Sequence, residues 1–147
     1  MKYLLCLDGS EGSTKVLSRL PLLAKPDDEF VLFFGWTSTW IPPTGWDIEP
    51  DLEPMGAEFQ SQEDFARKTV LKRKEELAKT GVPEEHIKTM LRECGDVREE
   101  ILKVASEEKV DIIALGSRGH GTVGSLLLGS VSTYVVQHAS CSVMVIR

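Results

Sequence analysis

Short apolar runs and longer stretches of helical spacing alternate along the whole chain. The runs are rich in β-branched and aromatic residues, and each is too short for a buried helix. They read as strands buried on both faces, which is typical of parallel sheets. The pattern predicts five strands, at Lys2–Leu7, Phe30–Trp36, His86–Arg92, Val110–Leu115 and Ser142–Ile146.

The stretches between these runs place apolar residues on one face of a helix. Ser10 opens the first, and Gly95-Asp96 offers a cap for the third. The four predicted helices begin near Ser10, run from about Ala57 to Lys79, follow Asp96, and cover Val131–Gln137. Strands that alternate with helices predict an α/β fold with a mainly parallel sheet and helices on both faces. Ligands of such sheets lie beyond the carboxyl ends of the strands.

The composition fits a single globular domain over residues 1–147, because 147 residues with 41% hydrophobic content can bury a core. A net charge of -6 without a basic cluster argues against nucleic acid as a partner. No apolar run is long enough to span a bilayer, so we expect a cytoplasmic protein without a membrane partner. The three cysteines lack metal-ligand spacing and are expected to be reduced.

Residues 37–56 form the one long segment without a predicted element. It carries Trp40, Trp46 and four prolines, and it is longer than most connections in compact domains. Two interpretations remain open. The insert either covers a sheet face or subunit contact as an apolar strap, or it closes over a ligand as a lid.

The segment after Ile112 has the composition of an anion site. All 23 acidic residues precede it, and it contains five glycines, Gly116, Gly119, Gly121, Gly124 and Gly129. Glycine permits positive φ and a close approach of the backbone, while a helix N-terminus supplies unpaired N–H donors and partial positive charge. A nearby carboxylate would oppose anion binding, so its absence favours a phosphate ligand.

Two common phosphate-binding motifs match this segment only in part. Gly119-x-Gly121-x-x-Gly124 lacks the acidic residue that a dinucleotide site needs about twenty positions later, and Gly124-x-x-x-x-Gly129-Ser130 lacks the lysine of a P-loop. We find no base and nucleophile at catalytic spacing and no metal-ligand cluster, so no catalytic or metal residue is assigned. Any ATP hydrolysis should be slow.

The remaining spacing is Gly116-x-x-Gly119, nine residues, then Gly129-Ser130. It resembles the nucleotide motif of the universal stress protein family. Further similarity lies in Leu7-Asp8-Gly9-Ser10, Cys94-Gly95-Asp96-Val97, Asp111–Gly119 and Ser140–Val145. The resemblance implies a Rossmann-like sheet of order 3-2-1-4-5, like that of adenine nucleotide alpha hydrolases. It also implies ATP as the ligand, with ADP or AMP as alternatives and Mg²⁺ as companion ion, and a homodimer joined through the C-terminal strand.

The same resemblance implies a role for each matched residue. Asp8 faces the adenosine moiety, and the backbone near Phe34 and Gly35 contacts the base. Gly116 and Gly119 shape the loop around ribose and phosphates, and Arg118 either pairs with the γ-phosphate or is solvated. The phosphates meet the start of the fourth helix, at Gly129, Ser130, Val131 and Ser132. One departure is the bulk of Phe33–Trp36, which is expected to narrow the adenine slot.

These features predict a nucleotide-binding regulatory module of the stress response that changes its affinity for an unknown protein partner with occupancy. The alternative is a slow ATP hydrolase or phosphotransferase that uses the same loop. A third interpretation is a phospho-acceptor receiver domain, which Asp8 at a strand end favours. The sequence argues against it because no neighbouring acidic pair is present to bind Mg²⁺.

Overall fold

The computed structural model describes residues 1–20, 24–25, 27–39, 61–117 and 128–147. Its strands are β1 (Lys2–Leu7), β2 (Glu29–Trp36), β3 (Ile87–Glu93), β4 (Ile112–Gly116) and β5 (Ser142–Ile146). Its helices are α1 (Glu11–Arg19), α2 (Gln62–Lys79), the 3₁₀ turn η3 (Glu84–His86), α3 (Val97–Glu107) and α4 (Ser130–His138). Each predicted strand and helix has its counterpart among these elements.

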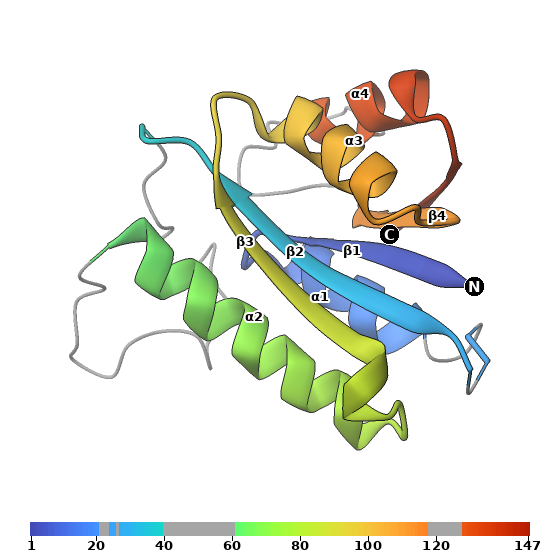
Figure 1. Cartoon of the computed structure of the whole chain (residues 1–147). Coiled ribbons are helices and arrows are strands. Elements are labelled where there is room, and N and C mark those ends of the chain that lie inside the picture. Colours follow the sequence, from blue (N-terminus) through green and yellow to red (C-terminus); the bar gives the residue numbers. More distant parts are fainter. Residues whose placement is uncertain (21–23, 26, 40–60, 118–127) are drawn as a thin grey trace.

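The strands form one sheet of order β3-β2-β1-β4-β5 in which every pair is parallel. Helices α1 and α2 lie on one face, and α3 and α4 lie on the other (Figure 1). The predicted α/β architecture and strand order are confirmed. The order reverses between β1 and β4, and this switch point is where parallel α/β sheets bind their ligands.

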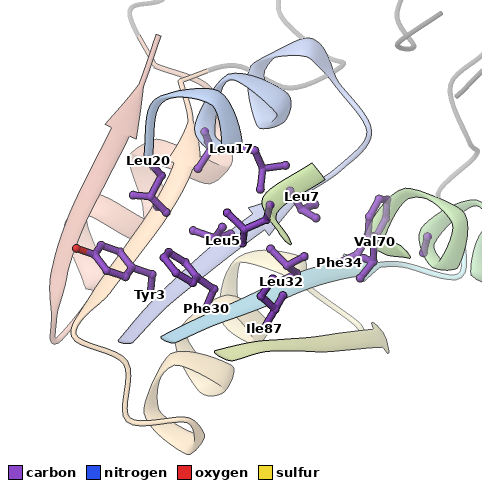
Figure 2. Packing of buried hydrophobic residues seen from close by; sticks show 14 of the residues in the cluster. Tyr3, Leu5, Leu7, Leu17, Leu20, Phe30, Leu32, Phe34, Val70 and Ile87 are labelled. Carbon is purple, nitrogen blue, oxygen red and sulfur yellow. The ribbon is translucent and has the colours of Figure 1, made fainter. Parts of the chain in front are cut away.

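Apolar side chains fill both sides of the sheet. On one side, alternate residues of β1 and β2 pack beneath α1 and α2 (Figure 2). The rings of Tyr3 and Phe30 stack there with centroids 5.4 Å apart. The other residues of the same strands, Leu4, Val31 and Phe33, pack against α3 and α4. This burial on both faces explains why the strands read as continuous apolar runs.

Several predicted boundaries differ from the structure by one or two residues, and two of the differences have a clear cause. His86 belongs to η3 rather than to β3, because Pro83 starts a tight turn in which the His86 N–H bonds the Pro83 carbonyl. Val110 lies in the turn that closes α3 and does not open β4. Its N–H bonds the Ala105 carbonyl at 3.0 Å while Lys109 takes φ of 52°, which is a left-handed helix C-terminus. Residues 57–60 of the expected second helix, like most of the 37–56 insert, lie outside the described residues.

Candidate functional site

The candidate site lies where β1, β2 and β4 end, on the edge opposite the N-terminus in Figure 1. β1 and β4 are direct neighbours, with Leu5 opposite Ala114. Asp8 follows the last residue of β1, and Ser117 follows the last residue of β4. The fold thus brings the Asp8 motif and the glycine segment to one edge, although about a hundred residues of sequence separate them.

A tight turn connects Asp8 to α1. Gly9 has φ of 81°, a conformation that other residues adopt at a cost. The Asp8 carboxylate accepts bonds from the Ser10 backbone N–H at 2.9 Å and from the Ser10 hydroxyl at 2.6 Å, both on Oδ1. Ser10 also caps α1, since its Oγ accepts the Ser13 N–H at 3.3 Å. Ser10 is therefore the cap of α1, and it also holds the Asp8 carboxylate by a hydrogen bond.

Gly116 lies against the first turn of α1. A Cβ atom built on Gly116 would approach the carbonyl carbon and oxygen of Gly12 to 2.6 Å, closer than real Cβ contacts. The missing side chain therefore lets α1 pack over the end of β4. This packing role is additional to the phosphate-loop role that the motif implies for Gly116.

Ser117 joins β4 to the start of α4. Its N–H bonds the Ile146 carbonyl at 2.8 Å, and its own carbonyl accepts the Gly129 N–H at 2.8 Å. The hydroxyl of Ser132, which is 2% exposed, donates to the carbonyls of Ser117 and Gly129. Two bonds to the Ser117 carbonyl, from the Gly129 N–H and the Ser132 hydroxyl, thus hold the first turn of α4 beside the end of β4, in the position that a phosphate-binding helix requires.

The N-terminus of α4 differs from those of the other α-helices. Ser10, Ser61 and Asp96 cap α1, α2 and α3 with a side-chain oxygen, whereas the cap residue of α4 is Gly129, which has none. Ser130, the first helical residue, is exposed and Val131 is half-buried. A helix start without a side-chain acceptor keeps its N–H donors for an external anion.

Gly129 itself has φ of -72° and ψ of 167°. This is extended backbone that any residue adopts, so Gly129 is not needed for a positive φ. Its dihedral angles therefore do not explain the glycine at this position.

The bulky residues at the end of β2, which the sequence places near the adenine slot, are buried in the two cores. Phe34 and Trp36 point into the core beneath α1 and α2, and Phe33 points into the opposite core. Phe34 packs edge-on against Phe65 with centroids 6.0 Å apart. The alternation of a buried strand sends these side chains to the two faces rather than past the sheet edge.

The backbone of β2 distinguishes the two residues predicted to contact the base. The Glu29 N–H donates to the Met1 carbonyl, which precedes β1. The Trp36 carbonyl accepts the Cys94 N–H, which follows β3. Because backbone direction alternates along a strand, Gly35 faces β1 and Phe34 faces β3. The last β1–β2 pair is Leu7 with Phe34, so the Gly35 carbonyl lies just past the shared ladder.

Three titratable groups near this edge have shifted pKa values, namely Cys6, Cys94 and Asp96. Burial, followed by the charge of Asp8, raises the pKa of the Cys6 thiol well above its ordinary value. Burial likewise raises the pKa of Cys94. At the start of α3, hydrogen bonds from Arg98 lower the pKa of Asp96 to about 2. The described residues hold no group of three or more His, Cys, Asp or Glu side chains that could bind a metal.

Two predicted site residues, Arg118 and Gly119, lie outside the described residues. Within the described part, the fold brings together the remaining ones, Asp8, Phe34, Gly35, Gly116, Gly129, Ser130, Val131 and Ser132, at the same sheet edge. Sequence reasoning missed Ser117 and Gly12. Ser117 lies inside the glycine motif, but the role of Gly12 arises only from packing between distant segments.

Comparison with known proteins gives a consistent result. The model of the universal stress protein family matches residues 1–147. YxiE, a universal stress protein of Bacillus subtilis, is 32% identical over 152 residues, covering 99% of this chain and 98% of the relative. A universal stress protein of Thermus aquaticus is 47% identical over 75 residues, which span 51% of this chain and 53% of that protein.

Solved structures share the fold. MJ0577 of Methanocaldococcus jannaschii superposes with a TM-score of 0.73 at 25% identity, covering 99% of this chain and 94% of that one. A family protein of Arabidopsis thaliana solved with AMP bound has a TM-score of 0.70 at 19% identity, covering 99% and 90%. A universal stress protein solved in complex with cAMP has a TM-score of 0.70 at 16% identity, covering 100% and 96%. With the whole chain matched by the family model, this protein belongs to the universal stress protein family.

Proposed function

We propose that this protein is an ATP-binding regulatory module of the stress response that acts as a homodimer. The observation that carries the proposal is the α4 N-terminus, which lacks a side-chain cap and is fixed beside the end of β4 at the switch point. No aspartate or glutamate follows Asp111, so the segment carries no carboxylate to repel phosphates. The regulatory role is proposed from membership of the universal stress protein family.

Each part of the nucleotide has a proposed contact. The Gly35 carbonyl, past the β1–β2 ladder, would accept a bond from the exocyclic amine of the base. Asp8 would face the ribose, and the backbone of Ser130, Val131 and Ser132 would bind phosphate oxygens. Arg118 and Gly119 would complete the loop around the phosphates. Mg²⁺ would arrive on the triphosphate, where the exposed Ser130 hydroxyl offers an oxygen ligand of the kind that Mg²⁺ prefers.

Two structural relatives support an adenine nucleotide in particular, because their structures contain AMP and cAMP. The choice of ATP rests on the complete glycine spacing, with ADP and AMP as the competing ligands. In the part of the chain that the structure describes, no helix is long and apolar enough to cross a membrane.

The first prediction is saturable ATP binding. We expect calorimetric titration with Mg²⁺ and ATP to give one site per chain, with GTP weaker because its base carries an oxygen where adenine carries the amine facing the Gly35 carbonyl. Mass spectrometry of small molecules released on denaturation would identify the nucleotide carried from the cell. Phosphate release assays should show ATP left largely intact. No saturation at millimolar ATP would overturn the proposed function.

The homodimer is proposed from the outer edge of β5. The Ser142 N–H and the Ile146 carbonyl bond toward β4, so the intervening Val143 and Val145 direct their backbone groups outward. Val143, Met144 and Val145 are half-buried apolar residues on this edge strand. An edge of this kind favours pairing with another chain, and antiparallel pairing of two β5 strands closes a two-fold dimer.

The second prediction tests this edge. Val145→Pro removes an N–H that points away from β4, so we expect the variant to keep its fold but sediment as a monomer. Sedimentation equilibrium at tens of micromolar gives the mass, and circular dichroism confirms that helices and sheet persist. A wild-type monomer, or a Val145→Pro variant that stays dimeric, would contradict the proposed contact.

A further inference from the structure

Ser10 has two structural roles, because it binds the Asp8 carboxylate and caps α1. It is 6% exposed, and its hydroxyl group makes bonds on two sides. Oγ donates to Asp8 at 2.6 Å and accepts from the Ser13 N–H at 3.3 Å. The first bond holds a carboxylate at the end of β1, and the second starts α1. One buried hydroxyl therefore connects the Asp8 side chain to the helix that follows it.

The helix start that Ser10 caps is itself tightly held. The Ser10 carbonyl accepts the Thr14 N–H at 3.2 Å and the Ser13 hydroxyl at 2.9 Å. On its other side, the backbone of Gly12 and Ser13 packs against Gly116 at the end of β4. The Ser10 hydroxyl is thus fixed relative to both β1 and β4, and it cannot move without disturbing the packing of α1 on the sheet.

We propose that Ser10 is a positioning residue for nucleotide binding, which fixes the Asp8 carboxylate toward the adenosine part of the ligand without touching the ligand itself. The inference rests on the proposed function. A carboxylate at a strand end can rotate about two side-chain torsions, and a short bond from a buried, fixed hydroxyl removes that freedom. Less conformational freedom is then lost when the nucleotide binds.

Ser10→Ala removes the hydroxyl bond to Asp8 but keeps the bond from the Ser10 backbone N–H. We expect ATP to bind a few-fold to about tenfold more weakly, because the less restrained Asp8 side chain must then be ordered when the nucleotide binds. Adenosine should lose the same factor as ATP, since Asp8 faces the adenosine part. Ser10→Thr retains the hydroxyl and should restore most of the affinity.

A double-mutant cycle separates positioning from helix capping. If Ser10 acts through Asp8, Ser10→Ala should change affinity in the wild-type background and leave it unchanged in the Asp8→Ala background, which has no side-chain acceptor for the Ser10 hydroxyl. Ser61→Ala is the matched control, because it removes the corresponding cap of α2. It should lower stability without the loss in affinity. Thermal unfolding monitors the fold of each variant.

Each outcome decides a different question. A wild-type protein that binds neither ATP nor adenosine overturns the proposed function, and this inference falls with it. A wild-type protein that binds both, with unchanged affinity in Ser10→Ala, overturns only the role of Ser10. If Ser10→Ala loses the same affinity in the wild-type and the Asp8→Ala backgrounds, Ser10 acts through helix capping alone, and the inference is also overturned.

Discussion

Gly116→Ala is expected to destabilise the protein by about 2–3 kcal/mol, the range of overpacked interiors. The new Cβ atom would lie 2.6 Å from the Gly12 carbonyl carbon and oxygen and 3.1 Å from the Ser13 nitrogen. These are backbone atoms of the first turn of α1, so no side chain can rotate away. Either α1 moves off the sheet or the end of β4 bends, and both disturb the core beneath α1.

Urea unfolding measures this loss, and Gly95→Ala provides the control. Gly95 is exposed, and a Cβ atom built on it would meet nothing within 4 Å. That variant should unfold within about 0.5 kcal/mol of the wild type, as surface substitutions do. If Gly116→Ala has the same urea midpoint as the wild type, the close packing of α1 on β4 is wrong. The effect on stability is expected with or without nucleotide.

The contrast between these two glycines shows what the sequence could predict. The strand and helix pattern followed from hydrophobic periodicity, because β1, β2 and β4 are buried on both faces and each crossover helix covers one face of the sheet. Strand order came from the family resemblance. The glycine spacing identified Gly116 as part of a site, but the contact with Gly12 needed coordinates, since it joins segments about a hundred positions apart.

Side-chain packing and helix caps also needed coordinates. The bulk of Phe33, Phe34 and Trp36 predicts a narrowed adenine slot, but a sequence does not show where these side chains pack, and the structure buries all three. The motif gives the spacing of Gly129 but not its dihedral angles, which are those of extended backbone. The structure assigns the cap of α1 to Ser10 and that of α4 to Gly129.

Gly129→Asp should have opposite effects on stability and on binding. Gly129 caps α4 in an extended conformation that aspartate adopts readily, and its N–H and carbonyl bonds to Ser117 and Thr133 do not involve a side chain. Aspartate would cap the helix and interact favourably with its dipole, so stability should stay equal or rise by a few tenths of a kcal/mol. Its carboxylate would, however, occupy the N–H donors that we assign to the phosphates.

We therefore expect Gly129→Asp to weaken ATP binding about 100-fold, from lost donors and from repulsion between the carboxylate and the triphosphate. Gly129→Asn is the matched variant, because asparagine caps a helix about as well but carries no charge. The smaller loss of ATP affinity in Gly129→Asn measures the competition for the N–H donors. The difference in affinity between the two variants measures the charge repulsion. Added salt should narrow that difference, since exposed charges are screened. Calorimetry gives the affinities and urea unfolding the stabilities. If the Gly129→Asp protein binds ATP as tightly as the wild type, the phosphates do not lie at the start of α4, and the proposed orientation of the nucleotide must be abandoned.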